Sequence, residues 1–211
     1  RLSRLSDELG PVRDAHVWLE FIERPYVRRA LRGEPRLRAL KTRFARLKDG
    51  HETRARRILN SARFRRALRD LRRLLRDEMP RLFGTAARRP VLAAAAAPLR
   101  KELKRIRRQS DLAGGGAPDA LHDWRKKVRR ARYWAESLAP YAGRWMADAG
   151  RALKRLASAL GEIHDMDMHL AESEGLPPAL VRCIEENRRR GLAKLPAAWR
   201  RLQETLEKHS V

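Results

Sequence analysis

Nearly every segment of this 211-residue chain is composed of residues that favour the α-helix. Leucine, arginine, alanine, glutamate and lysine dominate, and the β-branched residues that strands prefer are sparse. Hydrophobic residues make up 43% of the chain, which is too high a share for a charge-rich disordered tail. The length is sufficient to bury a sizeable core. We therefore predict an all-α protein of packed helices.

Proline and glycine divide the chain into these helices. The segment "LAGGGAPD" (residues 112–119) is the best internal linker, because three glycines cannot hold a helix together. Pro118 and Asp119 suit the first turn of the helix that follows. We expect the other breaks at residues 10–11, 25, 33–35, 60–61, 80, 84, 90, 98, 140, 161, 177–178 and 196. The alanine-rich segment 91–98 is predicted to be a packed helix rather than disordered.

A sequence repeat lies on either side of the linker. The segment "RLSRLSDELGPVRDAHVWL" (1–19) aligns without gaps with "ALKRLASALGEIHDMDMHL" (152–170), with matched leucines and with Gly10 on Gly161. Residues 119–139 precede the second segment, so we expect the equivalent helix of the first copy to lie before Arg1. The repeat predicts a single domain over residues 1–211. Its first copy occupies 1–110, without its first helix in this chain, and its second occupies 118–211.

The charge balance limits the partners of the chain. Lysine and arginine number 50 against 26 aspartates and glutamates, a formal net charge of +24. Such an excess destabilises a compact chain unless a polyanion relieves it, which points to nucleic acid, anionic lipid or polyphosphate. No apolar run is long enough to span a bilayer, and the single cysteine, Cys183, suits a reducing compartment. We expect a cytoplasmic protein without a membrane partner.

Much of this charge lies on one predicted helix, residues 119–138. On a helical wheel of about 100° per residue, the apolar side holds Leu121, Trp124, Val128, Ala131, Trp134, Ala135 and Leu138. The opposite side holds His122, Arg125, Lys126, Arg129 and Arg132, with Arg130 at its margin. Solvated charged faces usually alternate in sign, whereas after Asp119 in its first turn this helix offers only Asp123 and Glu136 as acids. The pattern favours a bound polyanion over a merely solvated face.

This helix, "LHDWRKKVRRAR", together with "LKRLASALGEIHDMDM" after a short turn, resembles the CHAD domain (conserved histidine α-helical domain) family. The first copy has the matching ending "LGPVRDAHV". The resemblance implies two four-helix bundles related by pseudo-twofold symmetry, with a basic groove between them. It also implies binding of inorganic polyphosphate, in some members at polyphosphate granules.

The resemblance also implies which side chains contact the polymer. By position they are His122, Arg125, Lys126, Arg129, Arg130 and Arg132 on the signature helix; Lys154 and Arg155 on the next; Arg4 in the first copy; and Arg54, Arg57, Arg63, Arg65, Arg188 and Arg189 on the later helices of each copy. The second copy has His164 where the family usually has arginine, which removes a permanent charge. The pKa of His122 should fall among the arginines, and a bound phosphate chain would raise it.

Two other functions remain open. A nucleic-acid backbone is the alternative polyanion, but proteins that read single strands usually add stacking aromatics. Here Trp124, Trp134 and Trp199 occupy core-like positions, and only Tyr133 lies among the cations. The preferred polymer length and the oligomeric state are not indicated by the sequence.

An enzymatic function would rest on "DMDMH", where Asp165, Asp167 and His169 are the candidate ligands of a divalent metal ion. We expect these carboxylates instead to cap a following helix or to pair with arginines, because a helix break is expected close by. No phosphate-binding loop or nucleophile elbow is present. We predict no catalytic residue, no metal site and no cofactor.

Overall fold

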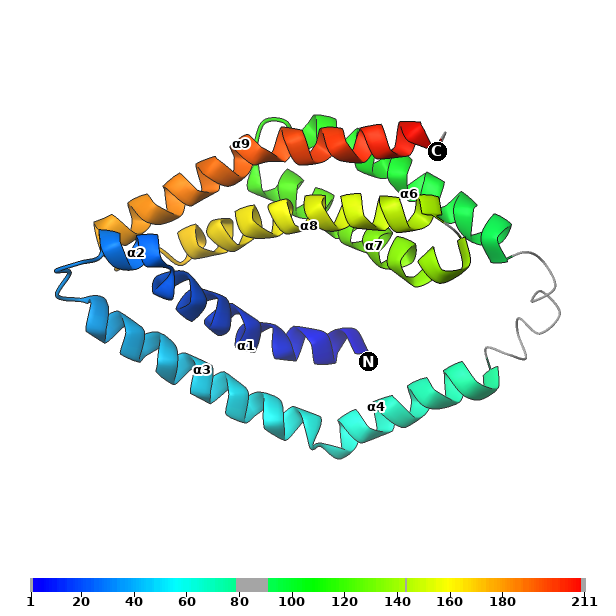
Figure 1. Ribbon diagram of the computed structural model, residues 1–211. Coiled ribbons are helices and arrows are strands. Elements are labelled where there is room, and N and C mark those ends of the chain that lie inside the picture. Colours follow the sequence, from blue (N-terminus) through cyan, green and yellow to red (C-terminus); the bar gives the residue numbers. More distant parts are fainter. Residues whose placement is uncertain (1, 79–90, 143, 210–211) are drawn as a thin grey trace. The chain divides into compact units, whose positions relative to one another are not determined.

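The computed structural model describes residues 2–78, 91–142 and 144–209 (Figure 1). The side chains of residues 2–7, 9, 91–98, 112 and 141–142 lie outside this description. The described residues form eight α-helices and one π-helical turn, with no strand among them. In chain order these are α1 (Leu2–Glu23), α2 (Pro25–Ala30), α3 (Leu37–Leu59), α4 (Ala62–Arg73), η1 (Leu74–Glu78), α6 (Val91–Ala113), α7 (Pro118–Ala142), α8 (Arg144–Ala171) and α9 (Pro178–Lys208). The prediction of an all-α protein is confirmed for this part of the chain.

Several predicted breaks are confirmed, and their local chemistry explains them. Helix α6 ends before the glycine linker and α7 begins at Pro118, with Gly116 at a positive φ of 71°. This is a left-handed conformation that favours glycine. Between α3 and α4, the Ser61 hydroxyl accepts a hydrogen bond from the Phe64 amide at 3.1 Å, which caps α4.

Other predicted breaks are wrong. Helix α1 runs through Gly10 and Pro11, α8 runs through Gly161, and the prolines at 98, 140 and 196 lie inside helices. A proline inside a helix removes one backbone hydrogen bond and costs about 3 kcal/mol. The breaks expected at 80, 84 and 90 lie outside the described residues.

Backbone contacts divide the chain into two compact units. The first comprises Arg1–Ala87 with Gly175–Cys183. In it, α1 packs along α3, and the Trp18 and Phe44 rings stack with their centroids 4.7 Å apart. Phe21 and Ile22, which follow Trp18 on α1, are fully buried. This small aromatic core holds the first unit together.

The second unit comprises Arg88–Glu174 with Ile184–Val211, and it holds the larger core. Helix α7 packs against both α6 and α8, and α9 contributes Leu195 and Leu202 to the same cluster. The Trp124 and Trp199 rings meet edge to face, with their centroids 5.6 Å apart. No helix of the described residues has a stretch long and apolar enough to cross a membrane.

The predicted repeat boundaries, 1–110 and 118–211, concern sequence similarity rather than packing. Helix α6 falls in the first predicted copy, yet it packs on α7 in the second unit. The packing units therefore do not test the repeat. The repeat and the pseudo-symmetric pair of bundles stay predictions.

Candidate functional site

The cationic face of α7 lies along the antiparallel helix α8. Near the start of α7, the ring centroids of His122 and His164 are 4.8 Å apart. Near its other end, a side-chain carbon added at Gly150 would lie 3.6 Å from the Ala135 Cβ atom. Residue numbers rise along α7 as they fall along α8, so the two helices run in opposite directions. We call His122, Arg125, Arg129 and Arg132, which share one face of α7, the basic stripe.

The basic stripe is less exposed than the helical wheel predicts. Arg125 is only 6% exposed, and His122, Arg129 and Arg132 are half-buried. The prediction that Arg125 faces away from the core is therefore wrong. Because α7 packs against α6 on one side and α8 on another, its buried surface is wider than its apolar residues alone indicate. The stripe borders the seam between α7 and α8.

Helix α8 contributes a lysine to the same seam. Lys154 shares a helical face with Gly150, Ala157, Gly161 and His164, which are spaced three or four residues apart. The contact of His164 with His122 places one end of this face against the basic stripe, whereas Gly150 meets Ala135 on the apolar side of α7. Lys154 and its neighbour Arg155 are exposed.

Acidic side chains neutralise part of this charge. Asp123 pairs with Lys126 at 2.6 Å, and Glu136 pairs with Arg132 at 3.3 Å. A third acid, Glu102 of α6, lies 3.8 Å from Arg130, and sequence reasoning missed it because it comes from another helix. The Asp123 and Glu136 carboxylates are exposed, and exposed ion pairs of this kind contribute only about 0–1 kcal/mol, so they are easily exchanged for a stronger anion. Glu102 is buried.

Other cations of the seam have no such neutralisation. Within the described residues, no acidic partner reaches Arg129, Lys154 or Arg155. Their positive charge is therefore directed to solvent or to a ligand. The same region contains Lys127, which donates a hydrogen bond to the Gln109 side chain of α6 and so is turned toward that helix.

His122 occupies one end of the basic stripe. Burial lowers the pKa of its imidazole below the usual 6.5, and the charges of Lys126 and Arg125 lower that pKa further. Asp123 and Asp119 act in the opposite direction with smaller effect. The Nδ1 atom is buried and has no hydrogen-bond partner among the described residues. The expected fall of the pKa is confirmed, although burial is its largest cause rather than the arginines.

Arg188 of α9 has a structural role in the second unit. Its Nε donates to Asp167 of α8 at 2.5 Å, and its Nη2 donates to the Gly116 carbonyl oxygen at 2.7 Å. The predicted pairing of these carboxylates with arginine is confirmed at Asp167. The alternative role, capping of a following helix, does not apply there, because α8 continues to Ala171. Arg189, the next residue, is exposed.

The "DMDMH" residues do not form a gathered ligand set in the structure. In the described part of the chain, no three histidine, cysteine, aspartate or glutamate side chains lie close enough together to hold a metal ion. Asp167 faces Arg188, and His169 is 2% exposed. No catalytic arrangement of these side chains is evident.

The predicted arginines of the first unit are exposed on α3 and α4. Arg54 and Arg57 project from α3. Arg63 pairs with Glu8 at 2.9 Å, and Arg65 donates to the Asn60 carbonyl oxygen at 2.7 Å. Arg4 lies on α1, but its side chain is outside the described residues.

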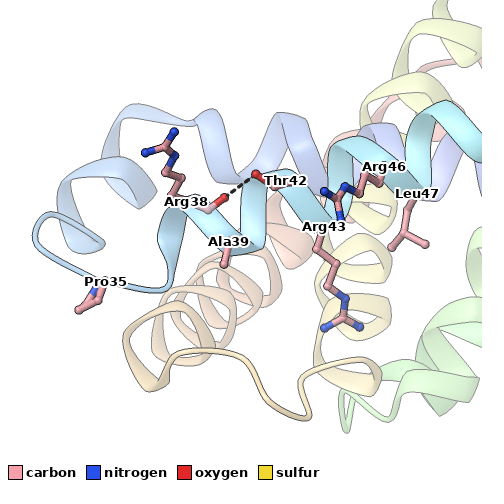
Figure 2. Close-up of a pocket in the computed structure, with 7 residues that line it drawn as sticks. All are labelled: Pro35, Arg38, Ala39, Thr42, Arg43, Arg46 and Leu47. Carbon is pink, nitrogen blue, oxygen red and sulfur yellow. Dashed lines mark hydrogen bonds between the residues drawn. The ribbon is translucent and has the colours of Figure 1, made fainter.

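Sequence reasoning missed a second basic surface on α3. Figure 2 shows Arg38, Arg43 and Arg46 beside an open hollow of about 750 Å³. Pro35, Ala39, Thr42 and Leu47 complete its lining. These arginines belong to no signature helix, and the only sequence signal is a helical face without acids between residues 38 and 47.

The exposure of the aromatic residues also differs from expectation. Trp124 is 3% exposed, as predicted, but Trp134 is 44% exposed and the prediction that it belongs to the core is wrong. Trp134 lies at the edge of the apolar stripe, where the neighbouring helices do not cover it. Next to it, Tyr133 is 47% exposed, with the Arg132 guanidinium carbon 4.6 Å from its ring centroid.

Comparison with known proteins gives one match. A family model described as the CHAD domain matches residues 1–172. No curated protein and no solved structure matches the chain significantly. The matched residues include the whole basic stripe and both copies of the repeated segment.

Proposed function

This chain belongs to the CHAD-domain family, and from that premise we propose that it binds inorganic polyphosphate at the seam of α7 and α8. One observation carries the proposal. Arg129, Lys154 and Arg155 lie in or beside this seam without an acidic partner among the described residues. The proposed activity is binding, without catalysis, and it suits association with polyphosphate granules.

The chemistry of the seam suits a repeating anion. The basic stripe spans ten residues of helix, which rise about 15 Å, so it offers a row of charges rather than a pocket for one anion. Arginine remains charged at any working pH and makes two parallel hydrogen bonds to phosphate oxygens. Polyphosphate presents no bases to read, so a row of cations is sufficient for recognition.

The candidate residues have different parts in this proposal. Arg129, Lys154 and Arg155 contact phosphate directly. Lys126 and Arg132 first release exposed carboxylates, and Arg130 releases the buried carboxylate of Glu102. Arg125 is the buried member of the basic stripe and supports the positions of its other side chains. Arg188 holds α9 against α8. The arginines of the first unit remain as separate contacts: Arg4, Arg54, Arg57, Arg63 and Arg65, with Arg189 in the second unit.

A charge-matched pair of variants tests the proposal. The first changes Arg129, Arg132 and Lys154 to glutamine, and the control changes the exposed cations Arg200, Arg201 and Lys208 to glutamine. Both lose three charges, but only the first loses them from the seam. We expect the seam variant to bind long-chain polyphosphate about 10 to 100 times more weakly, at about 0.5–1 kcal/mol per contact.

The measurement is calorimetric titration at about 150 mM salt, where the Debye length is about 8 Å. The control variant is expected to bind nearly as tightly as the wild type. Equal weakening of both variants would mean that the protein responds only to its overall charge. Unchanged binding by the seam variant would place the site elsewhere.

A nucleic-acid backbone is the second candidate ligand, and one observation favours it. Tyr133 is exposed beside the basic stripe and Trp134 is exposed on another side of the same helix, so bases could stack on either ring. Changing both to alanine should weaken binding of single-stranded nucleic acid and spare polyphosphate. Competition between the two polymers for the wild-type protein then shows which of them binds with the higher affinity.

A further inference from the structure

We propose that the His122–His164 pair couples polyphosphate binding to proton uptake, so that the protein binds the polymer more tightly as the pH falls. The inference rests on the proposed function and concerns the regulation of the same site. It begins from the geometry of the pair. The two rings come from α7 and α8, and their centroids are 4.8 Å apart with their planes inclined at 37°.

This pair lies at the end of the basic stripe, among other charges. The charged groups that act on His122 are Asp119, Asp123, Arg125 and Lys126 on α7, and Asp165 follows His164 in the sequence of α8. From α6, Glu102 reaches α7 at Arg130, two helical turns beyond His122. From α9, Arg188 is bound to Asp167. In the absence of an anion, two imidazolium rings at this separation would repel each other and the nearby cations.

A bound phosphate chain reverses this balance. Its negative charges favour the protonated form of each imidazole. A protonated histidine also has two N–H donors, whereas the neutral ring has one. The Nδ1 of His122 is buried without a hydrogen-bond partner among the described residues, so the other ring nitrogen, Nε2, would be the one to donate to a phosphate oxygen. Polymer binding therefore takes up protons, up to one for each ring.

The repeat indicates that this sensitivity is a property of the second copy. In the gap-free alignment of 1–19 with 152–170, Arg13 of the first copy falls on His164. An arginine at this position keeps its charge at every pH, and a histidine does not. The second copy thus carries a titratable cation where the first carries a permanent one. Substitution of His164 by arginine is the natural test of its role.

The test is calorimetric titration of long-chain polyphosphate into the protein between about pH 6 and pH 8, the range in which histidine titrates. Each pH is measured in two buffers that differ in ionisation enthalpy, which gives the number of protons taken up. A long polymer has few terminal phosphates per bound protein, so its own titration contributes little. For the wild type we expect proton uptake near neutral pH and a dissociation constant about ten times smaller at pH 6 than at pH 8.

Three variants separate the pair from other titrating groups. His164→Arg should bind more tightly than the wild type at pH 8 and show a smaller pH dependence, because only His122 still titrates, and His122→Gln should take up fewer protons than the wild type. The control His209→Gln removes a histidine that pairs with Asp148 and should retain the wild-type pH dependence. Circular dichroism at each pH establishes that every variant is folded.

Two outcomes would overturn the inference, and they differ from failure of the proposed function. Wild-type binding with no proton uptake and a constant affinity removes the inference and leaves polyphosphate binding intact. The same conclusion follows if a double variant, His122→Gln with His164→Arg, keeps the wild-type pH dependence. Absence of wild-type binding at every pH removes both the inference and the proposed function.

Discussion

Arg188 of α9 donates a hydrogen bond from Nε to the Asp167 carboxylate of α8, with the two atoms 2.5 Å apart. The same guanidinium donates to the Gly116 carbonyl oxygen at 2.7 Å, so one side chain joins α9 to α8 and to the linker before α7. Both charged side chains are largely buried, at 21% and 12% exposure. Arg188 therefore contributes to the stability of the second unit more than to its surface charge.

We expect Arg188→Gln to lower the free energy of unfolding by about 1–3 kcal/mol, because the Asp167 carboxylate is left largely buried without its cation. The neighbouring exposed variant Arg189→Gln removes the same charge and should change stability by less than about 0.5 kcal/mol. Urea denaturation followed by circular dichroism measures both. Equal effects of the two variants would contradict a structural role for Arg188.

The two tryptophans of α7 offer a matched comparison of burial. Trp124 is 3% exposed and meets Trp199 edge to face, whereas Trp134 is 44% exposed. Trp124→Ala should lower the free energy of unfolding by about 3–5 kcal/mol, as expected for a buried tryptophan. Trp134→Ala should cost about 1 kcal/mol or less. Thermal melts of both variants test whether Trp124→Ala is the more destabilising substitution. A larger loss of stability for Trp134→Ala would contradict this packing of α7.

The close approach of α8 and α9 depends on Gly191. A Cβ atom added there would lie 2.8 Å from Cγ1 of Ile163, which is fully buried and cannot move aside easily. We expect Gly191→Ala to destabilise the protein by about 1–3 kcal/mol through overpacking, despite the better helix propensity of alanine.

Gly161→Ala is the control for this prediction. Gly161 is also inside a helix, but nothing lies within 4 Å of an added Cβ atom. Its substitution should leave stability unchanged or raise it by up to about 1 kcal/mol. Denaturation midpoints distinguish the two variants. Stabilisation by both would mean that α8 and α9 pack less closely than described.

The periodicity of α7 predicts much of its core but not its neighbours. Leu121, Trp124, Val128, Ala131 and Ala135 are buried as the wheel indicates, because an apolar stripe must be covered. A wheel considers one helix at a time, so it could not predict which side of α7 receives α8. The packing of α8 against this side of α7 buries Arg125 and places the basic stripe along the seam between the two helices.

The periodicity of the sequence also could not predict contacts between distant segments. The pairing of Glu102 with Arg130 and the approach of Gly191 to Ile163 depend on where α6 and α9 pack. The cationic helix itself was evident from the sequence, since its charges occur within a few residues of one another. Local turn chemistry was predicted where glycine or proline ends a helix, but not where packing carries the helix through Pro11 or Gly161.

The salt dependence of polyphosphate binding distinguishes contacts with phosphate from stability effects. Each cation that contacts a flexible polyanion releases counterions, so the logarithm of the affinity falls with the logarithm of the salt concentration by about 0.7 per contact. The seam variant, with glutamine at 129, 132 and 154, should therefore show a slope about 2 smaller in magnitude than the wild type. The charge-matched variant at 200, 201 and 208 should keep the wild-type slope. Titrations at several salt concentrations measure both slopes, and an equal reduction in the two variants would show that polyphosphate is held by overall charge rather than by the α7–α8 seam.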